Sequence, residues 1–164
     1  EITLQKQDDL FMNGDQTLIL RMMINLNNQA INYGKINGHI HVILKGENDQ
    51  IVGEVKDDGI GISEEHLDRI WERFYRIDKS RSRENGGTGL GLSMVRWIVN
   101  LHNGTIHVES IEGIGTSFIF DFRKYKGLSL YIQFLFTKEK GSLFNVKVWM
   151  KLLVKKKGPY PFWI

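Results

Sequence analysis

The segment QIVGEVKDDGIGIS, residues 50–63, combines a strand pattern with a glycine-rich turn and is the starting point for predicting the fold of this chain. Its first half has the character of a β-strand. The strand then runs directly into Asp57, Gly59 and Gly61, which would place a carboxylate at a sheet edge beside a backbone that can approach a ligand closely. A glycine-rich turn with a capping aspartate is the plainer interpretation, and the segment alone favours neither.

Helix and strand signals flank this segment on both sides. Asp15 is a fair N-cap for a helix that runs to about Asn32, and Gly34 lies just past its expected end. Ser63 is expected to cap a short second helix whose first turn carries two glutamates. Further signals predict strands over residues 1–7, 39–46, 50–57, 105–110 and 116–122, and a third helix over residues 90–101. This order predicts an α+β fold, a two-layer sandwich with helices on one face of a mixed, mostly antiparallel sheet.

Composition and charge limit the classes of protein. The 164 residues include no cysteine and are 41% hydrophobic, so we expect one domain with a core, without disulfides or thiolate metal sites. No apolar run approaches the roughly 18 residues that span a bilayer. We therefore expect a cytoplasmic domain without a membrane segment, which is compatible with a membrane anchor in the full-length parent. Residues 123–164 carry ten Lys or Arg and one Glu, whereas residues 1–122 are net acidic, and this predicts a boundary between a domain (1–122) and a basic, aromatic-rich tail (123–164).

A glycine-rich segment, GGTGLGLS at residues 86–93, stands at the start of the third helix. Bare amides near a helix N-terminus suit a phosphate group, and a hinge between loop and helix is the alternative. The segment is not a P-loop, and it lacks the spacing and the preceding strand of a dinucleotide fingerprint. Upstream, WERFYRIDKSRSR (71–83) carries five basic side chains that could meet phosphate oxygens, although a solvated basic loop is the usual explanation. A nucleic-acid partner is disfavoured because residues 1–122 are net acidic.

The first helix carries many amides for a helix with a core face. In MMINLNNQAINYG, residues 22–34, one stripe starts apolar and ends in Asn25, Gln29, Asn32 and Tyr33. Asparagine is an indifferent helix former, because its side chain competes for the hydrogen bonds of the backbone. The amides form either a structural hydrogen-bond network or the wall of a ligand pocket, with oxygens facing a hard cation such as Mg²⁺.

In this order, the amide helix, DDGIGI, ERFYRIDKSRSR and GGTGLGLS resemble the ATP-binding catalytic domain of bacterial sensor histidine kinases. That domain belongs to the ATPase superfamily shared with gyrase, MutL and the heat-shock chaperones, the GHKL superfamily. The resemblance covers about residues 1–122, and the order of the motifs favours the histidine-kinase branch. It implies a Bergerat-type ATP-binding fold, ATP and Mg²⁺ as cofactors, and the ATP-binding portion of a protein histidine kinase in two-component signal transduction.

The resemblance also implies a set of ATP-binding residues. Asp57 looks like the carboxylate that accepts a hydrogen bond from the adenine amino group, Gly59 and Gly61 let the backbone approach the base, and Tyr33 packs on it. Asn25, the first amide of the N box, lies near the phosphates. The other implied positions are Gln29 on the metal, Arg73, Phe74 and Arg76 of the F box, Gly87, Thr88, Gly89, Leu90 and Gly91 of the second glycine box, and Gly115 and Thr116 before the last strand.

The N box departs from the family pattern at three positions. Where the family has Asn-Leu-apolar-x-Asn-Ala, this chain has NLNNQA over residues 25–30. Gln29 stands at the position of the Mg²⁺-ligating asparagine, Asn27 at an apolar core position, and Asn32 where a Lys or Arg usually helps to hold phosphate. Mg²⁺ tolerates poor octahedral geometry badly, and burying Asn27 without partners would cost roughly 1–3 kcal/mol. The alternative is therefore a degenerate, non-catalytic nucleotide-binding or interaction module of the same superfamily.

The phosphoacceptor is expected outside this chain. In the family, the acceptor histidine lies on a separate dimerising helical hairpin, so the implied partners are that domain of the same full-length kinase and then a response regulator. The ATP-binding portion alone is expected to be inactive. The chain's own histidines are expected to be surface or packing residues (His39, His41, His66, His102 and His107). The tail has no counterpart in the family, and we interpret it as an abnormal reading after the domain ends, with a basic appendage for an anionic surface or a nucleic-acid binder as alternatives.

Overall fold

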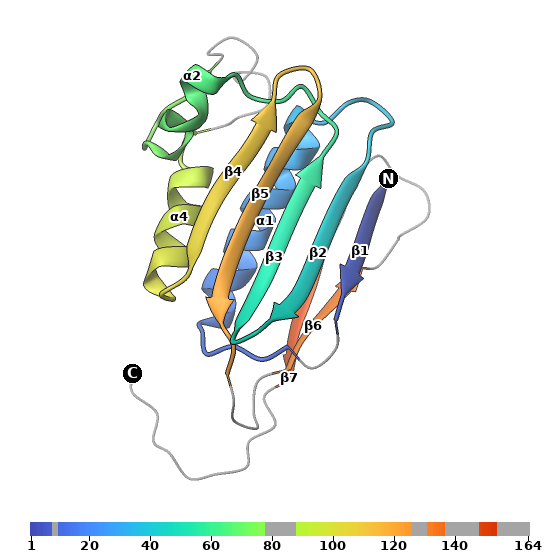
Figure 1. Ribbon diagram of the computed structural model, residues 1–164, viewed down its shortest axis with the longest axis vertical. Coiled ribbons are helices and arrows are strands. Elements are labelled where there is room, and N and C mark those ends of the chain that lie inside the picture. The colour runs from blue at the N-terminus through green and yellow to red at the C-terminus, as the bar shows by residue number, and fades with distance from the viewer. Residues whose placement is uncertain (8–9, 78–87, 126–130, 137–147, 154–164) are drawn as a thin grey trace.

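Five strands form one mixed sheet in the order β1-β2-β3-β5-β4 (Figure 1). The computed structural model describes residues 1–7, 10–77, 88–125, 131–136 and 148–153, the last two ranges by their backbone. β1 pairs with β2 in parallel, and β2–β3, β3–β5 and β5–β4 are antiparallel, which confirms the predicted mixed, mostly antiparallel sheet. The strands are β1 (Ile2–Lys6), β2 (Ile40–Glu47), β3 (Gln50–Asp57), β4 (Thr105–Ile111) and β5 (Gly115–Arg123).

The helices cover one face of this sheet, which gives the expected two-layer α+β sandwich. Figure 1 shows α1 (Gln16–Tyr33) and α4 (Gly91–Leu101) on the same side of the strands. A short helix, α2 (Glu64–Leu67), follows β3 and continues into a 3₁₀ turn at Arg69–Trp71. None of the helices in the described residues is long and apolar enough to cross a bilayer.

Local signals place the starts of α1 and α2 correctly, but only α1 has the expected side-chain capping bond. Asp15 Oδ1 accepts a hydrogen bond from the Leu18 N–H at 2.9 Å, which satisfies one of the free amides at the helix start. Gly34 ends the helix as expected. Ser63 is the N-cap residue of α2 as expected, but its side chain makes no capping bond to the first turn. The turn is closed instead by the Ser63 carbonyl oxygen, which accepts from the His66 N–H at 3.0 Å.

The core lies between the helical layer and the sheet. Its fully buried side chains come from α1 and α4 on one side and from alternate positions of the strands on the other. Burying each large apolar side chain stabilises the fold by roughly 1.5–3 kcal/mol, so the packing of these two helices on the sheet fixes the position of every loop at the sheet's ends. The largest of these fully buried side chains are Met22, Met23, Leu26, Val42, Val55, Val95, Ile98 and Val99.

Backbone pairing continues slightly past the predicted boundary at residue 123. The Lys124 N–H donates to the Asp49 carbonyl at 2.6 Å, and the Tyr125 N–H donates to the Phe11 carbonyl at 2.7 Å. Beyond it, β6 (Tyr131–Phe136) and β7 (Val148–Leu153) pair with each other as a separate antiparallel hairpin. The division into a domain and a tail stays a prediction, and these bonds place the end of the domain at Tyr125.

Candidate nucleotide-binding site

Asp57 is the buried carboxylate at the end of β3. In register it lies between Ile40 of β2 and Thr116 of β5, and it is 5% exposed. Its Oδ1 accepts a hydrogen bond from the Gly59 N–H at 2.9 Å. Burial raises the pKa of Asp57 above its ordinary value, while hydrogen bonds from the amides of Gly59 and Thr116 lower it in part. A buried carboxylate with unused acceptor capacity can hold a donor such as an amino group.

The turn after Asp57 approaches the end of α1 so closely that only glycine fits. A Cβ at Gly59 would lie 2.1 Å from the Tyr33 carbonyl oxygen. Gly61 has a φ of 67°, and a Cβ there would lie 2.1 Å from the Ile111 carbonyl oxygen. Between them the Ile60 N–H donates to the Tyr33 carbonyl at 3.0 Å. The turn is thereby held between α1 and the β4–β5 hairpin, with bare backbone at the two positions that were expected to face a base.

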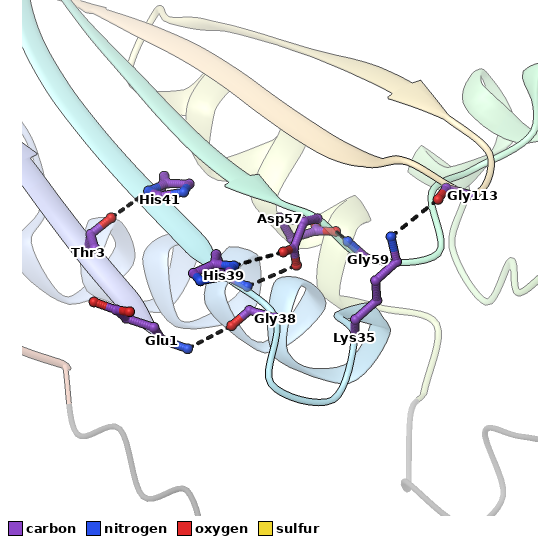
Figure 2. A network of polar contacts seen from close by, with 10 residues as sticks. Glu1, Thr3, Lys35, Gly38, His39, His41, Asp57, Gly59 and Gly113 are labelled. Carbon is purple, nitrogen blue, oxygen red and sulfur yellow. Dashed lines mark hydrogen bonds and ion pairs between the residues drawn. The ribbon is translucent and has the colours of Figure 1, made fainter.

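The loop between α1 and β2 holds the same region from the other side. Figure 2 shows Lys35 reaching across the turn, where its Nζ donates to the Gly113 carbonyl at 3.3 Å. Asp58 accepts from both the His39 backbone N–H at 2.9 Å and the ring Nδ1 at 3.0 Å. These bonds, the backbone one first, lower the pKa of Asp58 below its ordinary value. Asp58 is therefore a structural carboxylate, and Asp57 is the one left for a ligand.

Ser110 joins this region to Thr116, and sequence reasoning missed it. Thr116, which is buried, has its Oγ1 2.9 Å from the Ser110 Oγ. Ser110 Oγ also accepts a hydrogen bond from the Ile62 N–H at 2.8 Å. Two signals were available in the sequence. Ser110 lies four residues after Ile106 in the predicted strand and therefore on the same, core-facing side, and in the sheet it pairs directly with the expected site residue Thr116.

The amide stripe of α1 lies against the first turn of α4. A Cβ built at Gly91 would be 3.4 Å from Asn25 Oδ1 and 3.5 Å from Gln29 Nε2. The other end of the Asn25 amide, Nδ2, is 3.9 Å from the Met94 sulfur, so the oxygen is the atom turned toward Gly91. The first amides of a helix have no partner within the helix and suit an anion. Asn25, Gln29 and the glycine start of α4 therefore form one polar corner of the helical layer.

The F-box segment packs on the second glycine box through its backbone. The Phe74 N–H donates to the Gly89 carbonyl at 2.9 Å, and both residues have positive φ, 65° and 70°. Arg73 and Phe74 are exposed, whereas Arg76 is half-buried and its Nη2 has no hydrogen-bond partner among the described residues. Arg76 thus keeps a buried guanidinium donor that no described residue satisfies. Thr88 is exposed, Leu90 precedes α4 directly, and Gly87 lies outside the described residues.

The donor set restricts what kind of metal could be held. The described residues contain no cluster of three or more His, Cys, Asp or Glu side chains that could hold a metal. A cation at the polar corner would therefore rest on amide oxygens and on the phosphates of a bound nucleotide, which are ligands that Mg²⁺ accepts. At Gln29 the nitrogen is the atom nearest Gly91, and a half-turn of the terminal amide brings the oxygen there.

Asn27 sits in the core, as its N-box position implies. It is 4% exposed, and its Oδ1 has no hydrogen-bond partner among the described residues. The expected cost of burying this amide is therefore present in the structure. Asn27 points away from the polar corner that Asn25 and Gln29 share, because it belongs to the buried side of α1 with Met23 and Ala30.

Comparison with known proteins identifies the family. The profile of the "Histidine kinase-, DNA gyrase B-, and HSP90-like ATPase" family matches residues 14–126. Sensor histidine kinase WalK of Bacillus subtilis is 39% identical over 114 residues, which is 68% of this chain and 19% of WalK. SenX3 of Mycobacterium tuberculosis, a sensor-like histidine kinase, is 39% identical over 118 residues, 72% of this chain and 29% of SenX3. The chain thus spans less than a third of each of these curated relatives.

A solved structure agrees with the sequence relatives. The catalytic domain of histidine kinase ThkA is 32% identical with a TM-score of 0.66, and the match covers 76% of this chain and 80% of that domain. Its coverage shows that the likeness extends over nearly a whole catalytic domain and is not confined to one motif. The chain belongs to the family of histidine kinase-, DNA gyrase B- and HSP90-like ATPases, in which it corresponds to the ATP-binding catalytic domain of the sensor histidine kinases.

Proposed function

We propose that this chain binds Mg-ATP and presents its γ-phosphate to a histidine on a separate dimerisation domain of the same sensor kinase. One observation carries the proposal: α1 brings its amides to the start of α4 and its C-terminal end to the turn after Asp57. Asn25 and Tyr33 are eight residues apart on this helix, or about 12 Å along its axis. That separation allows one extended nucleotide to meet the buried carboxylate with its base and the polar corner with its phosphates.

At the base end, the chain's own groups favour an amino-bearing base. Asp57 would accept a hydrogen bond from the adenine amino group, while Gly59 and Gly61 let the turn pack against the carbonyls of Tyr33 and Ile111, which holds its backbone in place beside the base. Tyr33 is half-exposed at the end of α1, where its ring can cover a bound base. These contacts would orient the nucleotide and would not react with it.

At the phosphate end, the arrangement supplies positive potential and hydrogen-bond donors. The free amides at the start of α4 would hold the phosphate oxygens, and the Arg76 guanidinium, whose Nη2 has no partner among the described residues, would add positive charge. Asn25 and Gln29 would supply amide oxygens to Mg²⁺, which when bound neutralises charge on the phosphates. The contribution of this chain to transfer is positioning and electrostatic stabilisation.

The acceptor histidine is proposed to come from elsewhere, as the resemblance to sensor histidine kinases implies, and three of the five histidines here make contacts within the fold. His39 bonds to Asp58, His66 Nδ1 lies 2.8 Å from the Tyr75 hydroxyl, and His102 Nδ1 lies 2.7 Å from the Ile98 carbonyl oxygen. The acceptor would stand on the dimerisation domain, a response regulator would then receive the phosphoryl group, and the domain would work in the cytoplasm.

Calorimetric titration of the full chain with ATP and with ADP, each with and without Mg²⁺, tests the proposal. Saturable binding of one nucleotide per chain, strengthened by Mg²⁺, is expected. Absence of binding at millimolar nucleotide would refute it. Phosphotransfer to an added dimerisation domain separates a kinase from a non-catalytic nucleotide binder, since the latter would bind ATP without labelling the histidine.

A further inference from the structure

We infer that Ser110 is a positioning residue that sets the base specificity of this site, a role that rests on the proposed ATP binding. Ser110 would do so by fixing the hydroxyl of Thr116 as a hydrogen-bond acceptor beside Asp57 and by anchoring the turn that approaches the base. Ser110 itself lies behind both features, at the end of β4.

The hydrogen bonds of Ser110 leave one assignment of its proton. Its Oγ lies 2.8 Å from the Ile62 amide nitrogen, 2.9 Å from the Gly115 carbonyl oxygen and 2.9 Å from the Thr116 Oγ1. A hydroxyl has one proton to donate and two lone pairs. The amide of Ile62 can only donate, and the carbonyl of Gly115 can only accept. Ser110 therefore donates to Gly115, and Thr116 must donate to Ser110, which fills every hydrogen-bonding position of the Ser110 hydroxyl.

This assignment commits the proton of Thr116 and leaves its lone pairs free. Thr116 lies directly opposite Asp57 in the β3–β5 register, and both are buried. The Asp57 carboxylate accepts from the Gly59 amide through Oδ1 and also from the Thr116 amide, and its two oxygens, with about four lone-pair positions, keep capacity for a further donor. The side chains of Asp57 and Thr116 thus both present acceptors at this end of the sheet. A base with an exocyclic amino group finds partners there, whereas a base with a carbonyl at that position sets acceptor against acceptor.

The same hydroxyl holds the turn in place. Its bond to the Ile62 N–H fixes the residue that follows Gly61. The backbone of Gly61 passes so close to Ile111 that a Cβ on Gly61 would lie 2.1 Å from the Ile111 carbonyl oxygen. Removing the hydroxyl frees the turn at one end, and it also frees the Thr116 hydroxyl to rotate and donate. Both effects act at the base end and leave the polar corner at α4 untouched.

The test compares ATP with inosine triphosphate, which carries a carbonyl in place of the adenine amino group. With the full chain and Mg²⁺, calorimetry is expected to show that the native sequence prefers ATP by about 10- to 100-fold. Ser110→Ala should weaken ATP binding by about 10-fold and inosine triphosphate binding much less, so the preference collapses. Binding of inorganic tripolyphosphate should be unchanged. Ser110→Thr, which keeps the hydroxyl, should restore the preference.

Two further variants keep the outcome decisive. Ser117→Ala removes a nearby β5 hydroxyl that bonds to Glu54 on the outer face of the sheet, and it should leave the preference at the native value. If Ser110→Ala unfolds, Ser110→Cys preserves the size of the side chain with a weak donor, and it should also lose the preference. The inference is overturned if the native chain prefers ATP and these Ser110 variants keep that preference. Failure of the native chain to bind ATP at all would instead overturn the proposed function.

Discussion

Replacing Asn27 by leucine is expected to stabilise this protein. Asn27 is 4% exposed, and its Oδ1 has no hydrogen-bond partner among the described residues. An unsatisfied buried acceptor costs about 1–3 kcal/mol, which leucine removes while adding apolar surface to the core. Imperfect packing of the leucine side chain should reduce the gain in the free energy of unfolding by less than about 1.5 kcal/mol. The expected net gain in the free energy of unfolding is about 1–2 kcal/mol.

Urea unfolding followed by tryptophan fluorescence measures this gain. With a slope of about 2 kcal/mol/M, the midpoint should rise by about 0.5–1 M at an unchanged slope, and the melting temperature by about 3–8 °C. Asn28→Leu is the matched control, because Asn28 is the neighbouring residue of α1 and is exposed. Its effect should stay within about 0.5 kcal/mol. A midpoint for Asn27→Leu at or below the native value would show that the buried amide is satisfied, and the reasoning would be wrong.

Four other outcomes follow from the site and its surroundings. Because burial raises the pKa of Asp57 above its unfolded value, the chain should lose stability as pH rises through that raised pKa, and ATP affinity should fall as pH drops through it. Asp57→Asn should abolish both trends in pH-dependent melting and titration. Gly59→Ala forces a Cβ to 2.1 Å from a backbone carbonyl and should destabilise the fold by more than about 2 kcal/mol, whereas Gly113→Ala, with open space around it and a φ of 80°, should cost only about 1 kcal/mol. Gln29→Asn shortens the proposed metal ligand to the family's length, so the Mg²⁺-dependent part of ATP affinity should increase in calorimetry; no change would remove this side chain from the metal. A chain that ends at Tyr125 should melt within a few degrees of the full chain, and a large loss of stability would show that the hairpin beyond it is part of the domain.

Local signals were sufficient for the parts of this fold that depend on neighbours in sequence. Asp15 caps α1 as expected, because the capping bond reaches only three residues along the chain. The glycines at 59 and 61 were expected to bring the backbone close to a ligand, and the structure shows them close to the carbonyls of Tyr33 and Ile111, so the approach to a ligand stays a prediction. Ser63 shows the limit of the same approach, since its hydroxyl fits the capping pattern and the turn closes through its carbonyl oxygen instead.

Tertiary pairing decided the features that sequence could not supply. The three partners of Ser110 come from a loop 48 residues earlier and from the next strand, and only the sheet register brings them together. The same holds for the polar corner, where Asn25 meets Gly91 across 66 positions of sequence. For Asn27 the sequence indicated a core position, and the structure shows that the side chain is buried and that its oxygen has no partner among the described residues.

The glycines of this site differ in what requires them. At Gly59 and Gly61 the fold itself excludes a side chain, because backbone oxygens lie 2.1 Å from each Cβ position. At Gly91 the nearest atoms are the amides of Asn25 and Gln29 at 3.4 and 3.5 Å, an ordinary contact distance that an alanine would satisfy with a gain in helix propensity. The fold alone therefore does not explain glycine at the start of α4. The proposed nucleotide would account for it, because a methyl group there would occupy the space between two amide side chains and the helix start, where the phosphates are proposed to bind.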